Sequence, residues 1–273
     1  PREMLDGKLA PYLNDEKHAE QLSSALKIII NIVYGLTSAR FDNPFRDNRN
    51  VDNIVAKRGA LFMIDLKHAC QERGLTVAHI KTDSIKLPDA TPEDIKFVVN
   101  FGAKYGYAFE HEATYDRFCL INDAVYIAKK GKEWIAVGAQ FQHPYVYKTL
   151  FSHEDIQFED LCETKQVTQG VIYLDFDAAQ KPMHSYEGRH HVGRIGRFVP
   201  VTETSGGGVL LRVKDEKAYA VTGTKDYFWL EAEVAMAAIK EPDVEIDMSY
   251  FETMVDKAKE AIDYFGSFEE FVR

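Results

Sequence analysis

The chain of 273 residues holds 33 Lys and Arg against 43 Asp and Glu, a formal net charge of −10. This acidic balance excludes a protein that coats nucleic acid indiscriminately, although it permits a local basic groove. No apolar run approaches the length of a membrane span, and the three cysteines have no metal-ligand spacing. We therefore expect a globular, cytoplasmic protein with reduced thiols and no membrane partner.

The first long apolar stretch is residues 25–36, in which Lys27, Asn31 and Tyr34 are the polar positions. On a helix the spacing i, i+4, i+7 puts these three side chains in one column, and the remaining Ile, Val, Leu and Ala are predicted to be buried. Gly35 is a position at which such a helix can stop or bend. The β-branched run 28–30 fits a buried strand equally well, and Lys27 is then a core residue whose amine reaches solvent.

Loop chemistry rich in Asn, Asp and Pro follows over residues 40–50, and then a helical pattern over 53–73 that ends at Gly74. Two short alternating runs, 76–80 and 84–87, predict a hairpin with Asp83 at its tip. Thr91 is the expected N-cap of a helix over 92–105.

These segments, in this order, resemble the family B DNA polymerases, and their amino-acid sequences are similar to those of a bacteriophage branch of that family. The run from Lys27 to Gly35, Lys-x-x-x-Asn-x-x-Tyr-Gly, is similar to motif B on the fingers helix, with Ile32 in place of the usual Ser. The run from Lys81 to Ser84 resembles motif C, commonly Asp-Thr-Asp-Ser, with Lys81 in place of the first Asp. The resemblance continues to about Cys162.

The resemblance implies roles for these residues in template-directed nucleotidyl transfer from a dNTP to a primer 3′-hydroxyl. Asp83 would be the catalytic carboxylate and bind Mg²⁺, sharing two ions with an Asp of motif A. Lys27 and Asn31 would hold the triphosphate, Tyr34 would check the nascent base pair, and Gly35 would belong to the same substrate-binding motif. A fixed cation and an amide donor on one helix face suit a polyphosphate.

Strands are predicted over 107–111 and 117–128, where Tyr126 matches the Tyr of a Lys-Lys-Arg-Tyr stretch that supports the primer end in the family. In the last third we expect a hairpin from 209–212 and 218–222, and helices over 229–240 and 250–265. Four cations of this third are candidates to grip duplex phosphates, although a surface with scattered arginines fits them as well. They are Arg189, Arg194, Arg197 and Lys225.

The predicted fold class is α+β, a right-hand polymerase fragment with an antiparallel palm sheet covered by helices, a fingers helix and a mixed thumb region. The predicted segments are the C-terminal part of the fingers (1–50, with the first fingers helix and its turn over 1–20), the palm (51–150) and a thumb-like region (151–273).

Nothing upstream of Lys27 resembles motif A or a proofreading exonuclease. The chain is then expected to be either the C-terminal piece of a longer polymerase or one subunit of a polymerase encoded in two parts. We expect a second chain that carries motif A, the rest of the palm and fingers, and possibly an exonuclease, with primer–template DNA and dNTP as further partners. The isolated chain is then expected to be inactive. The alternatives are a non-catalytic module or polymerase remnant that binds primer–template DNA, and a plain α/β scaffold.

Overall fold

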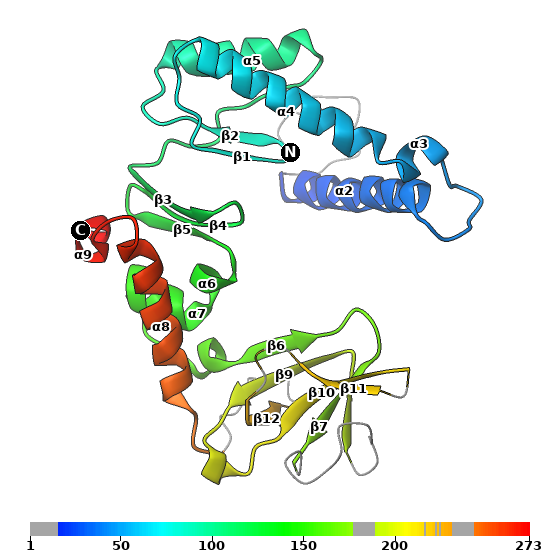
Figure 1. The fold of residues 1–273 in the computed structure, drawn as a ribbon, viewed down its shortest axis with the longest axis vertical. Helices are drawn as coiled ribbons and strands as arrows, with labels where there is room; N and C mark the ends of the chain where they lie inside the picture. The colour runs from blue at the N-terminus through cyan, green and yellow to red at the C-terminus, as the bar shows by residue number, and fades with distance from the viewer. Residues whose placement is uncertain (1–15, 177–188, 216, 222, 224, 231–242) are drawn as a thin grey trace. The chain divides into compact units, whose positions relative to one another are not determined.

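The computed structural model describes residues 16–176, 189–215, 217–221, 223, 225–230 and 243–273. The chain divides into two compact units, residues 1–111 and 112–273, and each is described by itself (Figure 1). Both units combine helices with small antiparallel sheets, which confirms the predicted α+β class. The predicted boundaries near 50 and 150 do not coincide with this division and stay a prediction. Among the described helices, none is long and apolar enough to span a bilayer.

The first unit contains four described helices and one hairpin. The helices are α2 (Glu16–Ser38), α3 (Asn48–Val51), α4 (Ile54–Glu72) and α5 (Pro92–Lys104), and the hairpin joins β1 (His79–Lys81) to β2 (Ser84–Lys86). Its core lies between α4, α5 and the hairpin. Phe62, Leu66 and Cys70 of α4 recur every four residues and therefore share the buried face of that helix.

Local chemistry sets the ends of these elements as the sequence predicts. Thr91 caps α5 through a capping box, because its side chain accepts from the Asp94 amide while the Asp94 carboxylate accepts from the Thr91 amide. Gly74 follows α4 with φ +84°, a left-handed conformation that glycine adopts without strain. Both predicted helices and the predicted hairpin are thereby confirmed.

Helix α2 is present, but the prediction that its apolar residues are buried is wrong. Ile28 and Ile30 are 60% and 66% exposed, and Ile29, Ile32 and Val33 are exposed as well. Because residues 16–20 already belong to α2, they are not the predicted turn between two fingers helices; residues 1–15 lie outside the described part. The apolar sequence predicted the helix correctly, but it does not show whether another protein surface packs on that helix.

The second unit begins with a sheet of order β3-β4-β5, formed by β3 (Arg117–Asn122), β4 (Val125–Lys130) and β5 (Glu133–Val137). The predicted strand over 117–128 is therefore a hairpin that turns at 123–124, and residues 107–111 do not form a strand. The helices of this part are α6 (Ala139–Gln142), α7 (Pro144–Tyr147), α8 (Met248–Asp263) and α9 (Phe268–Val272).

Helix α8 confirms the predicted amphipathic helix over 250–265, but its packing differs from its predicted place in a thumb. Val255, Ala258 and Ile262 pack into one core with Ile127 of β4 and Phe141 of α6. Figure 1 shows α8 beside α6 and α7. Helix α8 thus shares a core with the β3-β4-β5 sheet of the same unit.

The rest of the second unit is a two-layer β-sandwich. One sheet has the order β11-β10-β7-β8 and the other β12-β9-β6, all antiparallel. The strands are β6 (Glu163–Gln166), β7 (Val171–Asp175), β8 (His190–Gly193), β9 (Ile195–Pro200), β10 (Val209–Lys214), β11 (Lys217–Ala220) and β12 (Tyr227–Leu230). The predicted hairpin over 209–222 is confirmed as β10 and β11. The described part of the predicted region 151–273 thus contains these strands together with α8 and α9.

The core of the sandwich includes Ile172, Leu174, Phe198, Leu210 and Tyr227. The other side of the β12-β9-β6 sheet carries Val199 and Val201, which pack against Phe251 of α8. Of the helix predicted over 229–240, Trp229 and Leu230 belong to β12 and the remainder lies outside the described residues.

Gly170 precedes β7 with φ +77°, and a Cβ at this position would lie 2.2 Å from the carbonyl oxygen of Val213. We expect Gly170→Ala to lower the free energy of unfolding by about 2 kcal/mol or more, from left-handed strain plus the clash. Gly131→Ala is the matched control, because Gly131 has φ +60° with open space around it. Thermal unfolding of both variants measures the difference, and equal losses would contradict the close packing of residue 170 on β10.

Candidate functional site

The residues that resemble motif B form an exposed column on α2. Lys27, Asn31 and Gly35 are exposed, and Lys27 forms no ion pair with any described residue. The Tyr34 hydroxyl donates to Oδ1 of Asn53, the residue before α4, at 3.1 Å. Lys27 and Asn31 can therefore reach a ligand in solvent, while Tyr34 is held by a hydrogen bond to the next helix boundary.

Asp83, which resembles the second Asp of motif C, lies in the two-residue turn of the β1–β2 hairpin, as predicted. Lys81 pairs with Ser84 in the register, Thr82 takes φ +35°, and the Asp83 amide donates to the Lys81 carbonyl. The Asp83 carboxylate is exposed, and no described cation pairs with it. Its oxygens are therefore available as ligands.

A Mg²⁺ ion requires about six oxygen ligands, of which Asp83 supplies one carboxylate. Throughout the described ranges, no group of three or more His, Cys, Asp or Glu side chains is placed to hold a metal. The donor chemistry of Asp83 suits Mg²⁺, and the binding of Mg²⁺ by Asp83 stays a prediction.

Among the described residues, no hydrogen bond or ion pair connects Lys27, Asn31 or Tyr34 of α2 with Asp83. All four residues belong to the first unit, whereas Tyr126 and the candidate DNA contacts belong to the second. Tyr126 is 9% exposed, and its ring packs on Phe118 with the ring centroids 5.0 Å apart. A primer contact by Tyr126 stays a prediction, restricted to the small part of the residue that is exposed.

The prediction that Arg189 grips phosphate is wrong. Its side chain is 1% exposed, and Nε donates to Oδ2 of Asp175 at 2.6 Å. A buried ion pair of this kind holds the start of β8 to the end of β7. The sequence showed a glycine-rich basic stretch, but it could not show that one of its arginines has a buried carboxylate partner.

The other candidates are more accessible. Arg194 and Lys225 are exposed and Arg197 is half-buried. The ammonium of Lys225 lies over the Tyr250 ring, 5.4 Å from its centroid. Phosphate contacts by these three residues stay predictions.

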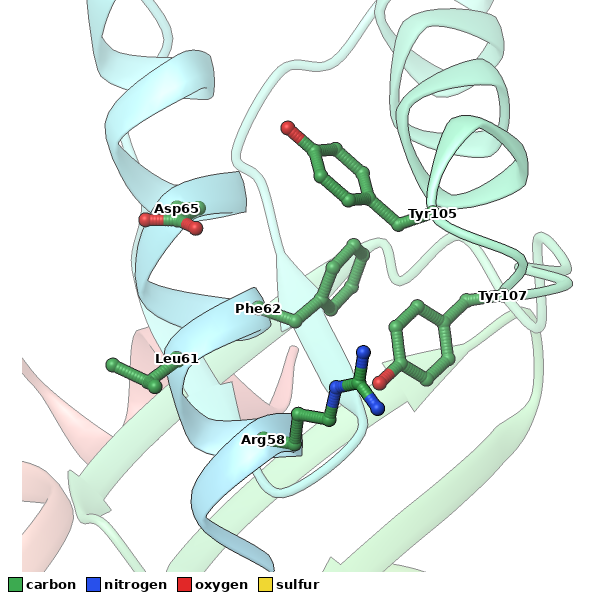
Figure 2. Close-up of a pocket in the computed structure, with 6 residues that line it drawn as sticks. All are labelled: Arg58, Leu61, Phe62, Asp65, Tyr105 and Tyr107. Atoms are coloured by element: carbon green, nitrogen blue, oxygen red, sulfur yellow. The ribbon is translucent and has the colours of Figure 1, made fainter. Parts of the chain in front are cut away.

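A hollow of about 460 Å³ on the first unit contains none of the predicted site residues (Figure 2). Figure 2 shows the Phe62, Tyr105 and Tyr107 rings and the Arg58 guanidinium gathered on one side, with Leu61 and Asp65 along α4. Leu61 is 62% exposed, and Ile54 and Ile64 of the same helix are also exposed. The hollow therefore belongs to a larger apolar surface of α4.

Sequence reasoning also missed a buried polar network in the second unit, centred on Glu163. Its Oε2 accepts from the Tyr227 hydroxyl at 2.6 Å and from Lys165 Nζ at 2.9 Å, and its Oε1 accepts from the Tyr250 hydroxyl at 2.6 Å. The network joins β6, β12 and α8. His143 Nε2 lies 3.9 Å from the same carboxylate, and burial lowers the pKa of His143, so we expect a neutral ring.

Glu163 makes stability depend on pH. Burial alone would raise the pKa of its carboxyl, but the hydrogen bonds from Tyr227, Tyr250 and Lys165 outweigh burial and lower it. Because the pKa of Glu163 is lower in the folded protein than in the unfolded chain, the carboxylate stabilises the fold at pH values above its unfolded-state pKa of about 4.3. This stabilisation is lost as the pH falls through the folded-state pKa.

We expect Glu163→Gln to lower the free energy of unfolding near neutral pH by about 2–4 kcal/mol, because charge-assisted hydrogen bonds are lost. The variant should lose less further stability than the parent when the pH falls below about 4. Glu203→Gln is the control, because Glu203 is exposed. Thermal unfolding over a pH series makes the comparison; parallel curves for the parent and Glu163→Gln would contradict this role of the carboxylate.

No protein-family model matches this chain, and no curated protein matches it in sequence. Among solved structures it is similar to the family B DNA polymerase of the hyperthermophilic archaeon Pyrobaculum calidifontis, with a TM-score of 0.45 and 12% sequence identity. The match covers 96% of this chain and 35% of the archaeal chain. At this level the similarity assigns no role to any residue.

Proposed function

We propose that this chain is the C-terminal portion of a template-directed DNA polymerase of family B, of a phage type, which adds dNTPs to a primer 3′-hydroxyl. It acts with a polypeptide segment that carries motif A. The observation that carries the proposal is the pair of ordered motifs with exposed chemistry: a column of Lys27, Asn31 and Tyr34 on a long helix, followed by Asp83 at a hairpin tip.

Each residue has a role that its environment supports. Lys27 has no ionic partner among the described residues, so its charge is available to the triphosphate, and the Asn31 amide one turn away can donate beside it. Tyr34, held by Asn53, keeps its ring at a fixed place on the helix, where it can contact the new base pair. Asp83 and the motif A Asp would hold Mg²⁺, and the ion would neutralise charge on the phosphates.

The motif A polypeptide would have an apolar surface of this chain to cover. The exposed side chains of α2 include Ile29 and Val33, and those of α4 include Leu61 and Ile64. Isolated apolar residues are normal on a protein surface, but contiguous helical faces of this kind mark an interface. A partner with the rest of the fingers and palm is the occupant that the motifs imply.

Lys27→Ala, assayed with the motif A polypeptide present, should raise the dNTP KM roughly ten- to a hundredfold and leave kcat closer to the parent. A charge-assisted contact to phosphate contributes about 1.5–3 kcal/mol. Lys57→Ala is the matched control, since Lys57 is an exposed lysine of α4. Steady-state primer extension measures both constants. An unchanged KM would remove Lys27 from the triphosphate site.

A second candidate function is a non-catalytic module that grips primer–template DNA. Two observations favour it. Asp83 is the one carboxylate in the turn 82–83, and the described part of the chain holds no group of three or more side chains placed to bind a metal. Duplex binding by the chain with no extension in any mixture containing motif A would favour this candidate over the polymerase.

A further inference from the structure

Helix α4 carries an exposed stripe that the core of its own unit does not use. Arg58 and Asp65 are seven positions apart, which puts their side chains in one column on a helix. Leu61 lies on one side of this column, with Ile64 next to it, and both side chains are exposed. Phe62 lies on the other side and is buried. The stripe therefore presents a line of charge and an apolar edge to solvent.

Both charges of the stripe are free to meet an outside surface. Arg58 and Asp65 are exposed, and neither forms an ion pair with another described residue. They are about 10 Å apart along the helix axis, too far to pair with each other. Figure 2 shows them at the two ends of the stretch of α4 that borders the hollow, with Leu61 between them. Two opposite charges thus frame an exposed leucine.

The stripe is complementary to itself. Arg58 and Asp65 lie at equal distances, about 5 Å along the axis, from the midpoint between Leu61 and Phe62. A second copy of α4 that runs antiparallel, related by a two-fold axis at this midpoint, therefore brings its Asp65 opposite Arg58 and its Arg58 opposite Asp65. The same axis brings Leu61 against Leu61 of the second copy. In a parallel pair in register, each charge would instead meet a like charge.

We propose that the isolated chain forms a symmetric dimer through antiparallel packing of α4 on α4 of a second copy. Two ion pairs between Arg58 and Asp65 frame an apolar contact made by Leu61 and Ile64 of both copies. One helix pair is small beside the interface of an obligate dimer, so the dimer depends on protein concentration.

This inference goes beyond the proposed function and concerns this chain alone. The motif A polypeptide is proposed above to cover Leu61 as well. It and the second copy would therefore compete for the same face of α4, and the dimer is the state of the chain before that polypeptide docks.

The test is sedimentation equilibrium of the full chain over a concentration series, which measures the dissociation constant of the dimer. Arg58→Asp and Asp65→Arg each turn both ion pairs into like-charge contacts, and each should weaken dimerisation roughly tenfold or more. Lys67→Asp is the matched control, because Lys67 is an exposed lysine of α4 that lies away from the stripe. It should stay within about twofold of the parent.

An equimolar mixture of the Arg58→Asp and Asp65→Arg chains should dimerise within about threefold of the parent, because every acidic side chain again faces a basic one in the mixed dimer. This recovery is specific to α4, since association through the apolar face of α2 does not depend on these two charges. It also shows that the single variants are folded.

Three results would each overturn the proposal. They are a parent chain that stays monomeric at the highest concentration, single reversals that dimerise like Lys67→Asp, and a mixture that dimerises no better than its components. Primer extension with the motif A polypeptide tests the polymerase function separately, so either idea can fail while the other holds.

Discussion

Asp83→Asn should reduce kcat for primer extension by about a thousandfold or more when the motif A polypeptide is present, with little change in duplex affinity. The carboxylate is exposed at the hairpin tip and has no cationic partner among the described residues, so removing its charge should leave the fold intact. A metal ligand acts on the reaction itself, and its loss therefore appears in kcat.

The control for this experiment is Asp89→Asn, which changes another exposed Asp of the first unit. It should leave kcat near the parent value. If Asp83→Asn kept near-normal kcat in a reconstituted, active mixture, residues 81–84 would be an ordinary turn and the assignment of motif C would be wrong.

The second large effect is expected from substitutions on the exposed apolar face of α2, which includes Ile29 and Val33. Ile29→Glu with Val33→Glu should weaken docking of the motif A polypeptide more than a hundredfold, since burying each side chain contributes about 1.5–3 kcal/mol and the new charges oppose burial. The same variant should reduce self-association of the isolated chain, which we expect the parent to show in size-exclusion chromatography with light scattering.

Ser24→Glu serves as the control, because Ser24 is exposed on the polar side of α2, near Lys27 in the helical rotation. It should neither weaken docking nor change self-association. A parent chain that is a stable monomer and does not bind the motif A polypeptide would contradict the assignment of this face as an interface.

Features with short-range causes were predictable from the sequence. The Thr91 capping box, the Gly74 end of α4 and the hairpin around Asp83 each depend on residues a few positions apart, and the structure contains all three. The same is true of the spacing of Lys27, Asn31 and Tyr34, because helical periodicity alone sets it.

Features that depend on distant partners were not predictable in this way. The Glu163 carboxylate meets hydroxyls 64 and 87 residues further along the chain, and no local pattern predicts that meeting. The sequence around Arg189 predicts an exposed cation, whereas in the structure Arg189 forms a buried ion pair with Asp175. The apolar run of α2 predicted burial, but these side chains are exposed in the described structure. A hydrophobic pattern shows that a helix face is apolar and does not show which surface packs against it.

The central claim is that this chain supplies motifs B and C to a polymerase completed by motif A from another polypeptide segment. Primer extension with Mg²⁺ and dNTPs, comparing this chain, a motif A polypeptide from the same genome and their mixture, tests it most directly. The account predicts extension by the mixture and none by either component. Robust extension by this chain alone, or an inert mixture in which the two components demonstrably form a complex, would contradict it.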